Sequence, residues 1–282
     1  MSSSPPPKRR KEVKSAISSL QNDTKIILLD IEGTTTPITF VADVLFPYIR
    51  ENVAEYLDVH WKEEPCQQDI EALRLQAESD KAADGVVSIP DLCDDKECDE
   101  KTMKDAVVKS VLWLMDADRK VTALKQLQGH MWQDAYGSKL KGDLYEDVVP
   151  CIKRWKTEGK DVCIYSSGSV HAQKLLFGNS VEGDILPLLS GHYDTKIGAK
   201  VEKDSYTQIA EDLKVEPGEI LFLTDVTREA RPAKEAGLKS AIVVRPGNKA
   251  LSQEEKSEFD ILESFKELWP EWEDQNDGQE DK

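Results

Sequence analysis

The segment DIEGT at positions 30–34 carries two carboxylates, Asp30 and Glu32, at the end of the apolar run Ile26–Asp30. A strand end followed by a turn can point both carboxylates into one crevice, and Gly33 allows a tight turn and the close approach of an anion to main-chain N–H groups. One carboxylate can attack phosphorus to form an aspartyl-phosphate. The other can protonate the leaving oxygen and then deprotonate the attacking water. The competing interpretation is an acid-rich turn between a strand and a helix.

The segment SSGS at positions 166–169 follows a second apolar run, 162–165, and precedes a helical pattern. Hydroxyl groups and main-chain N–H groups at the start of a helix form a cradle for phosphate. Ser166 and Ser167 are therefore candidate phosphate-binding residues, although a serine before a helix is more often an ordinary N-cap.

Asp225 follows a third apolar run, 220–224, and its carboxylate is the type of ligand that Mg²⁺ prefers. Glu229 lies four residues further on and could orient a metal-bound water. The alternatives are an N-cap role for Asp225 and, for Glu229, a first-turn charge favoured by the helix dipole.

A lysine in the segment DTKIGAKVEK, 194–203, could neutralise a bound phosphate and keep the nucleophile ionised. Lys196, Lys200 and Lys203 all compete for this role. Spacing alone does not select one of them, and a surface position is the more typical one for each.

Alternating strands and helices predict how these groups are brought together. Four short aliphatic runs are typical of buried parallel strands, at 26–30, 162–165, 220–224 and 241–244. Helical patterns lie between or after them, at 149–158, 170–177, 203–213 and 228–236. We therefore expect an α/β fold with an open, mostly parallel, Rossmann-like sheet and helices on both faces. Right-handed crossovers place the loops after the strands at one edge, where such sheets bind ligands.

About a hundred residues interrupt this alternation after the first strand. They contain helical patterns at 43–56, 66–82, 99–115 and 123–132. We expect a helical cap over residues 43–142, inserted into an α/β catalytic core of residues 24–42 and 143–269. Because the insertion leaves at the predicted active edge, it could act as a lid. The basic tail 1–23 and the acidic tail 270–282 are expected to be disordered.

The net charge of −17 disfavours nucleic acid and anionic membrane as partners. No apolar stretch approaches eighteen residues, which excludes a transmembrane helix. Five cysteines without a secretory signal indicate reduced thiols and a cytoplasmic location. A nuclear location is also possible, because the basic run 8–11 is either an import signal or a solvated tail.

Taken in order, these motifs resemble those of the haloacid dehalogenase superfamily of phosphohydrolases, with Glu32 where that superfamily usually has Asp. Within the superfamily, the chain looks like an enolase-phosphatase of methionine salvage over nearly all of residues 25–265. The stretches that carry this resemblance are ILLDIEGTTTPITFVADVLFPYI, TALKQLQGHMW, IYSSGSVHAQKLLFG, YDTKIGAKVE and ILFLTDVTREA.

The resemblance implies a small phosphate ester as substrate, 2,3-diketo-5-methylthiopentyl 1-phosphate, and its conversion to the acireductone by enolisation and phosphate hydrolysis. It also implies a monomer with one Mg²⁺ per chain. Carried over by motif, Asp30 and Glu32 are catalytic and form the metal site together with Asp225. The residues implied to contact the substrate are Ser166, Ser167 and Lys200. The base for enolisation stays open between Glu32, a residue of the cap and a metal-bound water.

Two other functions remain as alternatives. One is a phosphatase of the same superfamily that acts on a different ester; a dehalogenase is less favoured, because carbon–halogen cleavage needs no acid at position 32. The other is a non-catalytic interaction protein, although such a protein has no need for the whole set of polar residues. A dinucleotide-binding role is not supported, because no Gly-x-Gly-x-x-Gly motif follows the first strand.

Overall fold

The computed structural model describes residue 17 and residues 19–90 and 99–269 of the chain. The chain divides into two compact units, one formed by 1–41 with 141–282 and the other by 42–140. The basic run 8–11 and the acidic tail from residue 270 lie outside the described residues. Nothing in the described ranges forms a helix that is long and apolar enough to span a bilayer.

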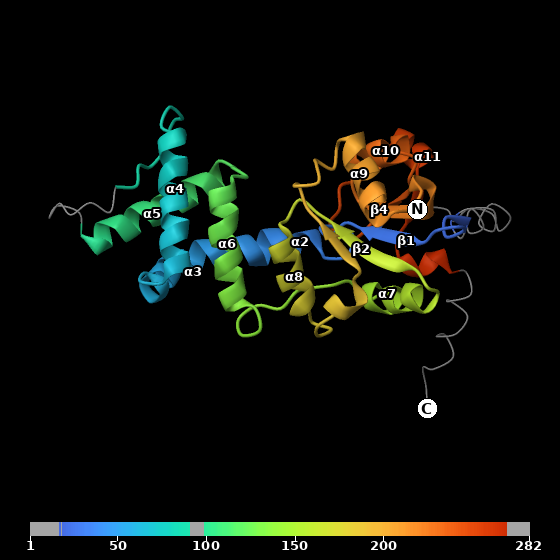
Figure 1. The fold of residues 1–282 in the computed structure, drawn as a ribbon, viewed down its shortest axis with the longest axis horizontal. Helices are drawn as coiled ribbons and strands as arrows, with labels where there is room; N and C mark the ends of the chain where they lie inside the picture. Colours follow the sequence, from blue (N-terminus) through green and yellow to red (C-terminus); the bar gives the residue numbers. More distant parts are fainter. Residues whose placement is uncertain (1–16, 18, 91–98, 270–282) are drawn as a thin grey trace, which may run out of the picture. The chain divides into compact units, whose positions relative to one another are not determined.

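The described part of the first unit is built on a parallel sheet in the order β3-β2-β1-β4-β5-β6 (Figure 1). The strands are β1 (Ile26–Leu29), β2 (Asp161–Tyr165), β3 (Gly191–Tyr193), β4 (Ile220–Thr224), β5 (Lys239–Val243) and β6 (Asp260–Leu262). The chain runs outward from β1 to β3 and then returns past β1 to β4. The strand order therefore reverses between β1 and β4, and open α/β sheets bind ligands in the crevice at such a point.

Helices cover both faces of the sheet, as predicted. Right-handed crossovers place α7 (Val148–Thr157) and α8 (Val170–Gly178) on one face, and α9 (Lys203–Leu213) and α10 (Thr227–Glu235) on the other (Figure 1). Alternate residues of each strand face opposite helices, so Leu28 and Phe222 pack with Tyr206 of α9 in one cluster. The shorter elements are α2 (Ile38–Phe40), α11 (Gln253–Glu258) and 3₁₀ turns at Leu186–Leu188, Pro217–Glu219 and Phe265–Leu268.

The four predicted strands are confirmed, each with bounds shifted by no more than two residues. The predicted α/β class is confirmed as well. β3 and β6, which are three-residue strands at the two edges of the sheet, were not predicted from the sequence. Edge strands of this length bury too few side chains to produce a recognisable apolar run. They form because the neighbouring strand offers hydrogen-bond partners, which their own sequence does not reveal.

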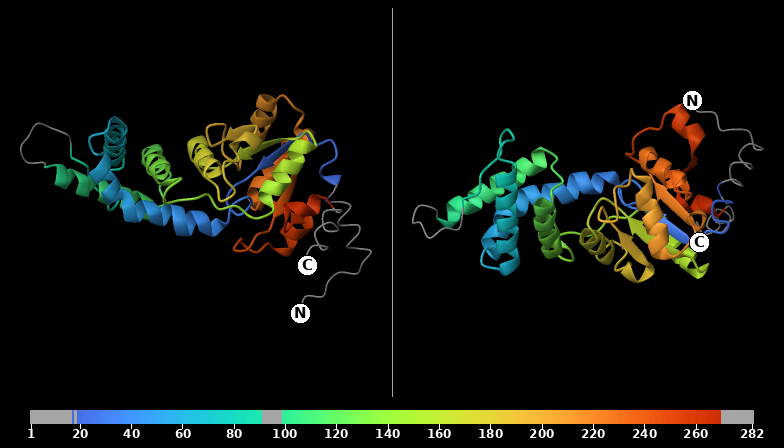
Figure 2. Two further views of the ribbon diagram at one scale, coloured as in Figure 1. Left: turned by 90° about the horizontal axis from the view of Figure 1, so that it is seen from below. Right: turned by 45° about the horizontal axis from the view of Figure 1, so that its top comes forward.

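The second unit is helical (Figure 2). A π-helical turn, Val41–Leu45, leads into α3 (Phe46–His60), which is followed by α4 (Glu64–Ser79), α5 (Glu100–Asp116) and α6 (Thr122–Ala135). Its core includes Leu57, Leu73, Val107 and Leu127, one from each of the four helices and all fully buried. One amphipathic face of each helix therefore packs into a shared core, which explains the helical periodicity of the sequence.

A buried carboxylate also joins two of these helices. Asp69 of α4 is fully buried, and its two oxygens lie 2.7 Å from Gln126 Nε2 and 2.7 Å from His130 Nδ1 of α6. Because both oxygens have partners, this polar group can be buried without a large desolvation penalty.

Candidate active site

Asp30 lies directly after β1, where the strand order reverses. Its main-chain N–H donates to the carbonyl of Leu223 on β4 at 3.0 Å, so the β1–β4 ladder continues up to this residue. Its side chain is only 6% exposed, and the Ile31 N–H donates to its Oδ1 at 2.7 Å. The sheet thus places a buried carboxylate in a fixed orientation at the ligand-binding edge.

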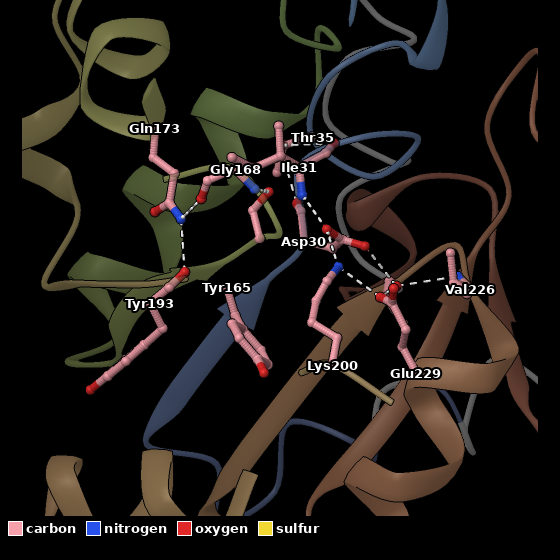
Figure 3. Close-up of polar contacts among 12 residues, drawn as sticks. Asp30, Ile31, Thr35, Tyr165, Gly168, Gln173, Tyr193, Lys200, Val226 and Glu229 are labelled. Atoms are coloured by element: carbon pink, nitrogen blue, oxygen red, sulfur yellow. Dashed lines mark hydrogen bonds and ion pairs between the residues drawn. The ribbon is translucent and has the colours of Figure 1, made fainter. Parts of the chain in front are cut away.

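Lys200 lies between two carboxylates at this edge, as Figure 3 shows. Its Nζ is 2.6 Å from Asp30 Oδ1 and 2.7 Å from Glu229 Oε2. Of the three lysines that compete for this role, Lys200 is buried, whereas Lys196 and Lys203 are exposed. The tertiary structure therefore brings Lys200 to Asp30, the candidate nucleophile.

Burial would lower the pKa of Lys200, but the charges of Asp30 and Glu229 and their hydrogen bonds outweigh burial and raise it. Lys200 is therefore a fixed positive charge beside Asp30. Its main chain is fixed as well, because the Tyr206 hydroxyl lies 2.6 Å from the Lys200 carbonyl and the Tyr165 hydroxyl donates to the Gly198 carbonyl at 3.0 Å. Both hydroxyls come from buried aromatic residues, so the sheet and α9 hold the loop that carries the lysine.

Thr224 was not a candidate from the sequence, yet it contacts Asp30. It is the last residue of β4 and is fully buried. Its hydroxyl donates to Asp30 Oδ2 at 2.8 Å and lies 3.3 Å from Glu229 Oε2. In the sequence, Thr224 looks like any β-branched strand residue, so only the pairing of β1 with β4 reveals its contact with Asp30.

Asp225 lies beside the turn that follows Asp30. A Cβ atom on Gly33 would come within 2.5 Å of Asp225 Oδ2, and Gly33 has φ +68°, so both its conformation and its surroundings require glycine. Burial, together with the Asp30 charge, raises the pKa of Asp225 to about 7. A partly buried carboxylate whose pKa is raised by a neighbouring carboxylate is typical of a site for a hard cation.

Glu32 lies in the turn itself, and its side chain is exposed. The turn is closed by a hydrogen bond from the Gly33 N–H to the Thr36 carbonyl at 2.8 Å. Within residues 17, 19–90 and 99–269, no three His, Cys, Asp or Glu side chains are grouped closely enough to hold a metal. The residues still fit Mg²⁺, which is often bound by one or two carboxylates with main-chain oxygens, waters and substrate completing the octahedron.

Ser166 and Ser167 follow β2 at the same edge of the sheet. Ser166 is buried and its Oγ accepts the Gly168 N–H at 3.2 Å, whereas Ser167 is exposed. Gln173 of α8 donates to the Gly168 carbonyl at 3.0 Å and to the Tyr193 carbonyl at 2.7 Å, which ties this loop to β3.

Two of the first three N–H groups of α8 are occupied by the protein itself. The Val170 N–H donates to Asp194 Oδ2 at 3.0 Å, and the Ala172 N–H donates to Ser169 Oγ at 3.2 Å. Ser169 is therefore the N-cap of α8. Contacts with a phosphate at this loop would come from Ser166 and Ser167 rather than from these two amides.

A buried aspartate, a serine, a buried lysine and a second aspartate at one edge of a parallel sheet define a hydrolase of the haloacid dehalogenase type. The model of the haloacid dehalogenase-like hydrolase family matches residues 24–237. The chain is 56% identical to enolase-phosphatase E1 of Branchiostoma floridae, covering 93% of this chain and 89% of the relative, and 54% identical to that of Danio rerio, covering 90% and 97%. The solved UTR4 protein of Saccharomyces cerevisiae is 31% identical, with a TM-score of 0.68 over 86% of this chain and 98% of that one.

The chain belongs to the enolase-phosphatase E1 family of the haloacid dehalogenase-like hydrolases. It is accordingly a phosphohydrolase, of a family in which dependence on Mg²⁺ is typical.

Proposed function

We propose that the chain converts 2,3-diketo-5-methylthiopentyl 1-phosphate to the acireductone of methionine salvage, by enolisation followed by phosphate hydrolysis through an aspartyl-phosphate at Asp30. The buried Asp30–Lys200 ion pair, at 2.6 Å where the strand order reverses, is the observation that carries this proposal. It supports the proposal because a buried carboxylate, held beside a cation at the ligand-binding edge of the sheet, is placed to act as a nucleophile.

In the hydrolytic step, an Asp30 carboxylate oxygen attacks phosphorus, and the bond from phosphorus to the enol oxygen breaks. Glu32 donates a proton to that leaving oxygen. Glu32 then takes a proton from a water that attacks the phosphorus of the aspartyl-phosphate, and phosphate departs with Asp30 regenerated. The exposed position of Glu32 in the turn is compatible with exchange of this proton with solvent.

Ser166, Ser167 and Lys200 would bind the phosphate oxygens, with Lys200 opposing their negative charge. Asp30 and Asp225 would hold one Mg²⁺, with Glu32 contributing its main-chain carbonyl, because a side chain bound to the ion could not also carry the donated proton. When bound, this ion supplies positive charge that stabilises the phosphoryl transition state and polarises the neighbouring ketone.

The test is an assay with the diketone phosphate, with and without Mg²⁺, that follows phosphate release and the enol chromophore together. Asp30→Asn should abolish phosphate release while the circular dichroism spectrum stays that of the wild type. Full activity of this variant would refute covalent catalysis by Asp30. A panel of sugar phosphates tests the identity of the substrate. Faster turnover of any of them than of the diketone phosphate would favour a phosphatase that acts on a different ester.

We further propose that the protein acts as a monomer with a single Mg²⁺ and that it resides in the cytoplasm, with the nucleus as a second location. Light scattering on the purified protein gives the mass to compare with 31.7 kDa, and calorimetric titration gives the metal stoichiometry. A dimer mass would contradict the proposed monomer, and two bound ions per chain would contradict the proposed single metal site.

A further inference from the structure

Asn248, in the loop after β5, has a side-chain amide whose orientation is defined by two carbonyl groups. Its Nδ2 donates to the Gly33 carbonyl at 2.8 Å and to the Val243 carbonyl at 3.3 Å. Because a carbonyl cannot donate, the amide nitrogen must face these two oxygens and Oδ1 must point away from them. That Oδ1 is buried and has no hydrogen-bond partner among the residues that the structure describes.

The same Oδ1 lies next to the Asp225 carboxylate. A Cβ on Gly33 would lie 2.7 Å from Asn248 Oδ1 and 2.5 Å from Asp225 Oδ2, so both oxygens border one small space that glycine leaves open. Asn248 Oδ1 is a buried acceptor without a donor, which is destabilising, and the Asp225 carboxylate at the same space carries negative charge when it is ionised. The space therefore requires a species that supplies hydrogen-bond donors or positive charge.

We propose that Asn248 Oδ1 accepts a hydrogen bond from a water in the coordination shell of the Mg²⁺ held beside Asp225. This inference rests on the Mg²⁺ site of the proposed function. Mg²⁺ keeps several of its waters, and a cation-bound water is a strong donor. Asn248 is thus a positioning residue: its Nδ2 fixes the turn at Gly33, and its Oδ1 orients the water.

Titration calorimetry with MgCl₂ on the full chain, without substrate, separates these two roles. Asn248→Ala and Asn248→Asp both remove the amide donor to Gly33, but only Asn248→Ala removes the acceptor as well. Asn248→Ala should weaken Mg²⁺ binding by about 10-fold or more, in the range typical of groups that orient a metal site from outside. Asn248→Asp should bind Mg²⁺ at least as tightly as the wild type.

Arg245→Lys is the matched control, because Arg245 holds the same turn through its Nε, which donates to the Thr34 carbonyl at 3.2 Å, and offers no acceptor. This variant should change the Mg²⁺ affinity by much less than about 10-fold. Wild-type affinity in Asn248→Ala, or an equal loss in Asn248→Ala and Asn248→Asp, would overturn the inference.

Two further outcomes are decisive. A wild-type protein that binds no Mg²⁺ would refute the metal site of the proposed function, and with it this role of Asn248. If Asn248→Ala does not fold, the Mg²⁺ affinity of Asn248→Asp is compared with that of the wild type. Weaker Mg²⁺ binding by Asn248→Asp would overturn the inference.

Discussion

The hydroxyl of Thr224 donates a hydrogen bond of 2.8 Å to Asp30 Oδ2, although 194 positions separate the two residues in the chain. This contact exists because β1 and β4 are neighbours, with Leu29 paired to Leu223. Asp30 Oδ1 has its own partners in the Ile31 N–H and Lys200. Both oxygens of the proposed nucleophile are therefore held in place before substrate binds, which lowers the entropic part of the barrier.

Replacing Thr224 by Val keeps the β-branched shape in a buried strand and removes the donor to Asp30. Hydrogen bonds to charged groups contribute about 1.5–3 kcal/mol, so we expect kcat to fall by roughly 10-fold to 100-fold. Steady-state kinetics measure this effect, and the thermal unfolding midpoint shows whether the fold is intact. An unchanged kcat would mean that the Thr224 contact has no part in catalysis.

Replacing Lys200 by Ala leaves Asp30 and Glu229 as adjacent buried carboxylates without a cation. Breaking a buried ion pair in this way destabilises a protein by about 3–5 kcal/mol, and we also expect a higher KM for the phosphate ester. The exposed Lys196 provides the control, since Lys196→Ala should change neither quantity appreciably. Denaturant unfolding and steady-state kinetics test both statements, and a larger rise in KM for Lys196→Ala would overturn the assignment of Lys200.

Asp225 and Glu229 should differ in their effect on metal affinity. Asp225→Asn removes a proposed ligand, so Mg²⁺ binding should weaken by more than roughly 100-fold, beyond the range for residues that only orient a ligand. Glu229 is paired with Lys200 at 2.7 Å, and Glu229→Gln should therefore change the affinity by less than about 10-fold. Calorimetric titration with MgCl₂ gives both constants. If Glu229→Gln lost as much Mg²⁺ affinity as Asp225→Asn, Glu229 would be a ligand of the metal.

The metal-free protein should lose stability as pH rises from about 4 to about 7, through the titration of Asp225. Its folded pKa is raised from 3.8 to about 7, so in this window the folded state binds a proton that the unfolded state has released. The contribution of Asp225 to the free energy of unfolding is fully present below about pH 4 and is lost as pH passes through about 7.

Asp225→Asn isolates this effect, because the variant has no group to titrate at that position. The difference in unfolding free energy, variant minus wild type, should grow with pH across the window and reach a few kcal/mol, since one pKa unit corresponds to about 1.4 kcal/mol. Denaturant unfolding in the presence of a chelator measures this difference at several pH values. A difference that is constant with pH would show that Asp225 does not titrate in this range.

The sequence by itself determined the α/β class, because each central strand is a short aliphatic run that is buried on both faces. It also placed Asp30, Ser166 and Asp225 directly after apolar runs, and therefore at strand ends. Residues that follow parallel strands lie at the same edge of the sheet, so their meeting there was predictable. The role of the helical insertion as a lid stays a prediction. The three-residue edge strands carried no signal, since their pairing depends on neighbours rather than on their own composition.

The family resemblance pointed to Lys200, but the residues and their spacing did not, and only the tertiary structure supplies the physical reason for this choice. Lys196, Lys200 and Lys203 have the same chemistry and similar spacing, and burial of Lys200 against Asp30 distinguishes it. The contacts of Thr224 and Asn248 likewise join strands and loops that are distant along the chain. Composition and periodicity indicate which residues are buried and in which elements they lie. A hydrogen bond between two strands depends instead on which strands are neighbours. The order of the strands is fixed only when the sheet forms.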